Sequence, residues 1–292
     1  MTDTFEQVAD GVFAYHHDWA DGLCAIVFGD DGAVAIDGGG DAADGETMAA
    51  FMRQHGREPT RLIYTHGHPD HVWGAAALGG GEVFSHELTP EVMRKQVPSW
   101  AQRWGVSQEE AAARVPWPTA TFGQTMSWYL GGRTIRSIRT PGHSTDGTSY
   151  LIEDCRTLIA GDAIATGIVP ALNDGDGRTL EMSHRLLLEK GDQIDVLVPG
   201  HGPVAHGDEV AACLRWGASY LRGVRTRVKQ QLVSGLEDQE ALEASCSYAE
   251  FVGDRFDSEL HHMPQRHATA VVKIISEERT RIPDHANTWD NI

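Results

Sequence analysis

The chain has 292 residues, of which 41% are hydrophobic and 23% are charged, as in an ordinary globular protein. This length is enough to bury a large core and lies near the upper limit for a single domain. The formal net charge of −18 repels phosphate backbones and anionic membrane surfaces, so nucleic acid is not an expected substrate. No stretch approaches the roughly 18 apolar residues of a membrane span, so no membrane association is expected.

The cysteines are widely spaced and form no CxxC pair; they are Cys24, Cys155, Cys213 and Cys246. A chain of this size does not need disulfides for stability. The opening segment MTDTFEQVADG is acidic and polar, without the apolar run of a secretory leader. We therefore expect a cytoplasmic protein with reduced thiols.

The first third of the chain alternates strand-like and helix-like segments. Residues 5–37 are typical of strands separated by DG and GDDG turns. A helix is expected over 45–55, a short buried strand at RLIYTH, a second helix over 70–78 and a further strand at GEVFSHE. This alternation predicts a layered α/β fold.

A tryptophan-rich stretch interrupts the alternation at about residues 88–130. We expect a helical insertion here, with aromatic side chains that fill a small core of their own. The alternative is an aromatic wall over the active site, and the two interpretations are compatible. The same stretch is also a candidate dimer contact. The candidate pocket residues are Trp100, Trp104 and Trp117.

Strand patterns return at 133–143, 148–164 and 195–202, with a loop and a helix at 174–190. After His206 the pattern is mainly helical, with helices expected over 207–231, 236–246 and 258–279. The first of these helices carries a basic cluster, which we expect to be a solvated face; a docking site for an anionic substrate tail is the alternative. The cluster consists of Arg215, Arg222, Arg225, Arg227 and Lys229.

The most informative segment is Thr65-His66-Gly67-His68-Pro69-Asp70-His71. Residues two apart in extended backbone point to the same side, so His66 and His68 can face one ion. Pro69 suits the first turn of a helix, which would bring Asp70 and His71 to a neighbouring position. Four donors within six residues predict a metal site.

Three more potential ligands follow strand-like segments. His143 and His201 each follow a Pro-Gly pair, and glycine allows the sharp turn that puts the next side chain at the rim of a sheet. Asp162 closes the apolar strand LIAGDAI. A buried carboxylate needs a partner because an unpaired buried charge is very costly. Two cations would be such a partner.

These motifs resemble the metallo-β-lactamase-fold hydrolase superfamily over about residues 5–205: HxHxDH at 66–71, then GH, GD and GH at 142–143, 161–162 and 200–201. The resemblance implies an αββα sandwich of two mixed β-sheets flanked by helices. It also implies that His66, His68 and His143 hold one metal, that Asp70, His71 and His201 hold a second, and that Asp162 bridges them. Asp37 matches an acidic position beside the site, although a turn or capping role explains it nearly as well.

Imidazole and carboxylate donors without a thiol favour zinc, then iron or manganese. The resemblance predicts a dinuclear hydrolase in which a metal-bridging hydroxide attacks the carbonyl carbon of a small acyl substrate. Asp70 would orient this nucleophile and move its proton. The bond would be an ester, lactone, thioester or amide-like bond. Ala165 stands where quorum-sensing lactonases carry tyrosine, which argues against that branch.

Three alternatives remain open. A β-lactam hydrolase uses the same framework. So does an iron-dependent persulfide dioxygenase, with one iron on His66, His143 and Asp162. A non-catalytic binding protein is disfavoured because every ligand position is filled.

The sequence thus predicts a main domain over 1–205, a helical extension over 206–280 and a loose tail over 281–292. A homodimer is an open prediction.

Overall fold

The computed structural model describes residues 4–19, 21–172, 174–257, 259 and 262–281. Nearly all of the predicted C-terminal tail lies outside the described residues. None of the described helices is both long enough and apolar enough to cross a membrane.

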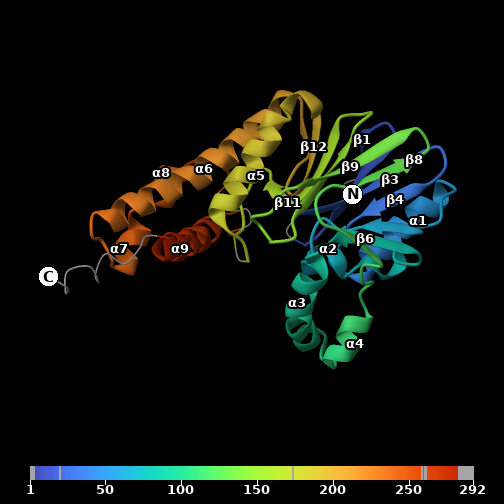
Figure 1. The fold of residues 1–292 in the computed structure, drawn as a ribbon, viewed down its shortest axis with the longest axis horizontal. Coiled ribbons are helices and arrows are strands. Elements are labelled where there is room, and N and C mark those ends of the chain that lie inside the picture. Colours follow the sequence, from blue (N-terminus) through green and yellow to red (C-terminus); the bar gives the residue numbers. More distant parts are fainter. Residues whose placement is uncertain (1–3, 20, 173, 258, 260–261, 282–292) are drawn as a thin grey trace.

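The described strands form one continuous, curled mixed sheet with two halves (Figure 1). The halves meet where β3 pairs with β12 through Gly22 and His201. Neighbouring strands β4 to β7 run parallel, as do β11 and β12. The first half contains β1 (Phe5–Ala9), β2 (Val12–His17), β3 (Gly22–Phe28), β4 (Ala33–Ile36), β5 (Arg61–Ile63), β6 (Glu82–His86) and β7 (Ala120–Phe122). The second contains β8 (Ser127–Leu130), β9 (Arg133–Arg139), β10 (Thr148–Ile152), β11 (Thr157–Ala165), β12 (Val196–His201) and β13 (Ala205–His206).

A hydrophobic core lies between the two halves of the sheet. Ile36 and Ile63 of the first half belong to the same buried cluster as Tyr150 and Val198 of the second. The strands β4, β10 and β12 are buried along their whole length, as expected for strands covered on both faces. The predicted sandwich is confirmed, although hydrogen bonds join its two layers into one sheet.

Helices cover the outer face of each half. On the first half, α1 (Ala42–Gln54) buries Met48 and Met52 in a cluster with residues of β3 to β6. The Asp41 side chain starts this helix by accepting hydrogen bonds from the Ala43 and Asp44 amides. On the second half, α5 (Gly177–Glu189) and α6 (Asp208–Val233) pack against β11 and β12. These helices complete the αββα order.

The tryptophan-rich stretch is helical only in its first part. There α3 (Thr89–Trp104) and α4 (Gln108–Ala113) form the predicted helices. The rest adds β7 beside β6 and β8 beside β9, which is a correction to the prediction of a helical insertion. The physical reason is the alternation in SWYL, where Trp128 and Leu130 are buried and Tyr129 is exposed.

The C-terminal helices form a core of their own beyond the sheet (Figure 1). The long α6 packs against α9 (Met263–Arg281), with α7 (Gln239–Ala244) and the short α8 (Tyr248–Phe251) alongside. Two members of the basic cluster are paired: Arg225 with Glu181, and Arg227 with Glu250. Because Glu181 is buried, the solvated face is a correction for Arg225 alone; Arg227 forms a surface ion pair, and the remaining members, Arg215, Arg222 and Lys229, are exposed as expected.

Candidate metal centre

The HxHxDH segment lies at the end of β5, where the chain turns into α2 (Pro69–Val72). Pro69 occupies the first turn of this helix, as predicted. The predicted helix over 70–78 is nevertheless interrupted after Val72, and only a short 3₁₀ turn, Ala75–Ala77, follows. The strand-to-helix corner points the segment's donors toward β11 and β12.

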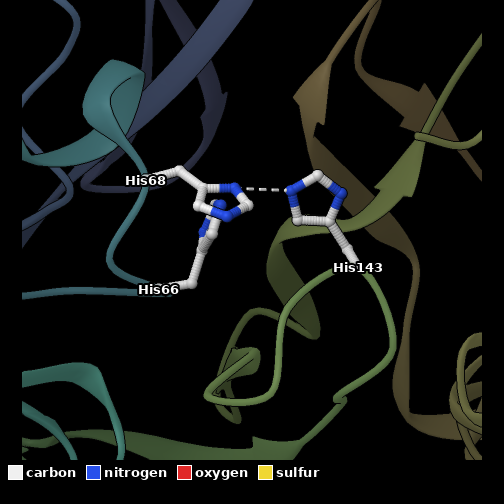
Figure 2. A group of neighbouring side chains, drawn as sticks. All are labelled: His66, His68 and His143. Atoms are coloured by element: carbon white, nitrogen blue, oxygen red, sulfur yellow. Dashed lines mark hydrogen bonds between the residues drawn. The ribbon is translucent and has the colours of Figure 1, made fainter. Parts of the chain in front are cut away.

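The first group of donors is His66, His68 and His143, whose nearest ligand atoms lie within 4.8 Å of one another (Figure 2). His68 Nδ1 is 2.8 Å from His143 Nε2. His66 and His143 are buried, with 1% and 6% exposure. The structure therefore brings these three predicted residues together.

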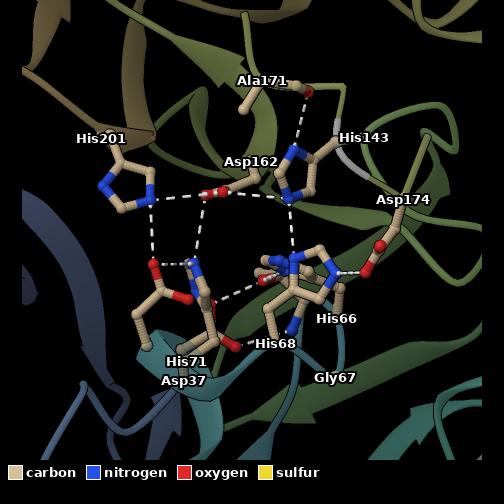
Figure 3. A network of polar contacts seen from close by, with 12 residues as sticks. Asp37, His66, Gly67, His68, His71, His143, Asp162, Ala171, Asp174 and His201 are labelled. Carbon is tan, nitrogen blue, oxygen red and sulfur yellow. Dashed lines mark hydrogen bonds and ion pairs between the residues drawn. The ribbon is translucent and has the colours of Figure 1, made fainter. Parts of the chain in front are cut away.

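The second group is Asp70, His71, Asp162 and His201, whose ligand atoms again lie within 4.8 Å of one another. Figure 3 shows the last three of these residues. The Asp162 carboxylate lies 3.1 Å from His71 Nε2 and 3.3 Å from His201 Nε2. Its Oδ2 atom is also 3.2 Å from His143 Nε2 of the first group. Asp162 thus stands between the two groups.

Four imidazoles are held through their outer nitrogen, which leaves the inner nitrogen directed into the centre (Figure 3). His143 Nδ1 donates to the Ala171 carbonyl at 3.0 Å. His68 Nε2 donates to Asp174 at 2.9 Å, and His71 Nδ1 donates to Asp37 at 2.9 Å. Such outer hydrogen bonds fix the ring orientation and the tautomer of metal-binding histidines.

His66, the fourth of these imidazoles, is anchored through Thr65. The Thr65 hydroxyl donates to Asp37 Oδ2 at 2.6 Å, so its oxygen can accept from His66 Nδ1, 3.0 Å away. The buried Nε2 of His66 then carries a lone pair and has no hydrogen-bond partner among the described residues. A buried nitrogen in this state fits a cation.

Asp37 is buried and holds the segment that carries the first donors, Thr65 to His71. Its Oδ1 accepts from the Thr65 amide at 2.7 Å, and its backbone has a positive φ of 63°. The sequence left a turn or capping role open for this residue. The structure instead places the carboxylate between Thr65 and His71.

The two groups differ in electrostatics. Burial lowers the pKa of His66 well below its usual value and that of His143 to about 4. Burial also opposes charge on His71 and His201, but the nearby carboxylates outweigh it. The pKa of His71 is raised well above its usual value, and that of His201 to about 10. Burial would raise the pKa of Asp162, but the nearby histidines hold it well below its usual value, so the second group pairs positive imidazoles with a negative carboxylate.

Two glycines allow these elements to meet. A Cβ at Gly200 would lie 1.9 Å from Asp162 Oδ1, and one at Gly161, where φ is +52°, would lie 2.6 Å from Thr65 Cβ. Larger residues at these positions would displace the carboxylate or the strand that carries it.

A cavity of about 500 Å³ opens onto both groups of donors and is bounded on its far side by α9. Asp174 and Trp19 line it, and no sequence motif marks either residue. Asp146, which accepts from the Gly67 amide at 2.9 Å, was also missed. All three lie in loops, where no periodic pattern marks them.

The tryptophans considered for the substrate pocket do not line this cavity. Trp100 is fully buried in the core under α1 and α3. The Trp117 indole donates to the Ala112 carbonyl at 2.8 Å. Trp104 lines a second, larger cavity that adjoins the first. The packing interpretation therefore applies to Trp100 and Trp117.

Comparisons with known proteins agree with this geometry. The family model described as the metallo-beta-lactamase superfamily matches residues 17–201. The hydroxyacylglutathione hydrolase GloC of Haemophilus influenzae is 27% identical over 61% of this chain and 84% of its own. A hydroxyacylglutathione hydrolase of Rhodopseudomonas palustris is 24% identical over 67% of this chain and 69% of its own.

Among solved structures, a metallo-beta-lactamase from Pontibacter korlensis superposes with a TM-score of 0.60 at 19% sequence identity. It covers 75% of this chain and 98% of its own. At this identity the likeness shows the fold. Together with the match over 17–201, it establishes that the chain belongs to the metallo-beta-lactamase superfamily.

Proposed function

We propose that this chain is a dinuclear metal-dependent hydrolase of small acyl compounds. His66, His68 and His143 would hold one ion, and Asp70, His71 and His201 a second. Asp162 would contact both. The observation that supports this most strongly is the outer anchoring of four imidazoles, which directs their inner nitrogens at two adjacent points.

Zinc suits this set of donors best, because imidazole and carboxylate are its usual ligands in catalytic sites. Iron and manganese accept the same donors. His68 Nδ1 and His143 Nε2 lie within hydrogen-bond distance, 2.8 Å apart, so a cation that displaces the shared proton could bind both nitrogens.

Bound ions would lower the pKa of a water from 15.7 to about 7 and polarise a substrate carbonyl. The chain's own residues supply orientation and proton transfer. Asp70 is the most exposed member of the second group, with 15% side-chain exposure, and it lines the cavity. One of its oxygens can therefore accept the proton of the attacking water and pass it to the leaving group.

Asp37 and Asp174 keep the imidazoles in place while this happens. Asp37 is buried and holds His71 and Thr65. Asp174 holds His68 from the solvent side of the cavity. These contacts fix the imidazoles before substrate binds. A site that is already in place lowers the activation free energy of the reaction, because its groups do not have to reorganise in the transition state.

The bond we propose is a thioester or ester. The names of the two bacterial relatives, both hydroxyacylglutathione hydrolases, support this choice. A lactone or an amide-like bond, including a β-lactam, uses the same attack on a carbonyl carbon. The superposition with a metallo-beta-lactamase bears on the fold alone.

Metal quantification combined with a substrate panel tests the proposal. The purified protein should contain about two zinc ions per chain and hydrolyse thioesters or aryl esters faster than β-lactams. Chelation should abolish turnover, and added zinc should restore it. One iron per chain with oxygen consumption on a persulfide would contradict the proposal and favour the dioxygenase alternative.

A further inference from the structure

A second cavity, of about 1400 Å³, lies beside the second group of donors. Gly202, which follows the donor His201, lines it. Trp19 lines both this cavity and the smaller one over the candidate metal centre, so the two share this residue as a boundary. A substrate held at the centre would reach the larger cavity by passing Trp19. We call this larger space the tryptophan cavity.

Three indoles form one side of the tryptophan cavity. The Trp19 and Trp73 rings are 5.3 Å apart, and the Trp73 and Trp104 rings are 4.7 Å apart. The Arg103 guanidinium lies 5.2 Å from the Trp19 ring and 5.5 Å from the Trp73 ring, which restrains both indoles. Trp73 is only 7% exposed, so Trp19 and Trp104 supply most of the aromatic surface that a flat ring could contact.

A buried histidine at the end of β2 supplies a polar contact in this cavity. His17 is 5% exposed, and neither ring nitrogen has a hydrogen-bond partner among the described residues. The strand register pairs His17 with Gly22, and Gly22 with His201. A Cβ at Gly22 would lie 2.2 Å from the His17 ring, so the ring occupies the space over this glycine.

This position puts His17 on the same face of the sheet as His201, with β3 between their strands. A buried polar group without a partner is costly, so such a group points to a bound water, ion or ligand. A ligand in the tryptophan cavity would supply the missing partner for the imidazole.

The charges around the cavity restrict the ligand further. One guanidinium, that of Arg103, faces five carboxylates, and these would repel an anionic ligand. A glutathione thioester carries carboxylates of its own and would meet this repulsion. The five are Glu6, Asp18, Asp21, Asp41 and Asp44.

We propose that the tryptophan cavity binds the larger half of the substrate, an aromatic group without negative charge, and that His17 hydrogen-bonds to it beside the scissile bond. This inference rests on the proposed hydrolase function and names its substrate class. His17 is then a binding residue, while Trp19 and Trp104 determine specificity.

Two matched esters test the charge and the ring together in the metal-loaded protein. They are 2-naphthyl acetate and 6-acetoxy-2-naphthoate, which differ by one carboxylate. The kcat/KM should be about tenfold higher for the neutral ester. The products 2-naphthol and 6-hydroxy-2-naphthoate provide an equilibrium readout, since their binding can be followed by indole fluorescence. The neutral product should bind about tenfold more tightly.

Variants locate the binding site. Trp104→Ala should weaken 2-naphthol binding about tenfold through lost aromatic contact. His17→Leu should weaken it several-fold and keep the metal content, and His17→Gln should recover part of the loss. Tyr129→Ala removes an aromatic ring that is 76% exposed on β8, and it should change nothing.

Reversing an exposed charge tests the electrostatic part of the proposal without disturbing the packing of the hydrophobic core. Asp18→Lys at the exposed rim should strengthen 6-hydroxy-2-naphthoate binding several-fold. Asp254→Lys, exposed in the helical extension, is the matched control and should have no effect.

The outcomes separate the two proposals. Binding of 2-naphthol that depends on Trp104, without hydrolysis of either ester, would support the cavity and contradict the hydrolase. Hydrolysis of both esters that is unaffected in all cavity variants would support the hydrolase and overturn the cavity assignment. A preference for the carboxylated probe that Asp18→Lys does not change would also overturn it, and would point to Arg266 in the smaller cavity.

Discussion

The two groups of donors lie side by side yet balance charge in opposite ways. The first is built from imidazoles alone, and burial keeps His66 and His143 neutral. The second contains two carboxylates, which hold positive charge on His71 and His201. The first group therefore offers free lone pairs to a cation, whereas the second must release protons before it can bind one. Asp162 lies within 3.3 Å of a histidine in each group, so its charge acts on both.

The largest effect is expected at this shared residue. Asp162→Ala removes the carboxylate between the groups, so metal content should fall below one ion per chain. Turnover should drop more than about 100-fold, since even outer contacts of metal ligands are worth 10–100-fold. Elemental analysis and kcat/KM measure the change, with Asp254→Ala as control. Wild-type turnover with both ions retained would contradict the assignment.

Single histidine variants separate the groups. His66→Ala should lose the first ion and His201→Ala the second, so each should retain about one ion per chain. If either variant instead loses both ions together, the groups are one cooperative site and the contrast drawn above is wrong. Elemental analysis with a spectroscopic metal such as cobalt would identify which position stays filled.

The two carboxylates that anchor imidazoles from outside should differ in how much they contribute to metal affinity. Asp37 is buried and holds His71, so Asp37→Asn should weaken metal affinity at the second group by 10–100-fold. Asp174 is 60% exposed at its side chain, and water can replace it beside His68. We expect Asp174→Asn to cost less than about tenfold. Competition with a chelator of known affinity measures both, and equal losses would argue against burial as the cause.

The smallest effect is expected for the pH dependence of stability at a buried histidine outside the candidate metal centre. Like His66 and His143, this histidine is kept neutral by burial, so it serves as a reference for the first group. His184 on α5 is buried without a carboxylate, and burial lowers its pKa to about 4. The unfolded chain binds this proton near pH 6.5, so the stabilisation from neutral His184 is complete above pH 6.5. It is lost as the pH falls from 6.5 to 4, and the total is about 3 kcal/mol.

Urea unfolding at several pH values tests this, because His184→Gln removes the group that titrates. The variant should lose less stability than the wild type between pH 6.5 and 4. An identical acid dependence in the two proteins would show that His184 does not carry the expected shift.

The candidate metal motif could be predicted from sequence because its donors follow strands directly. In extended backbone and tight glycine turns, local geometry alone directs His66, His143 and His201 to one edge. The layered fold followed in the same way from the alternation of strands and helices. Asp174 and Asp146 gave no such signal, since the packing of distant segments brings them to the site.

The environment of the tryptophans, in contrast, could not be predicted from the sequence pattern. Trp100 and Trp19 are the same residue type, yet one is core and the other lines both cavities. A large apolar ring fits either environment, and only the fold decides between them. His17 was missed for a related reason, because its significance depends on the strand register that places it over Gly22.

The most direct test of the account is anomalous X-ray diffraction from crystals of the zinc-loaded protein. Two peaks, about 3.5–4 Å apart on either side of the Asp162 carboxylate, are the predicted result. A single peak on His66, His143 and Asp162, with His201 and His71 left without metal, would contradict the dinuclear centre.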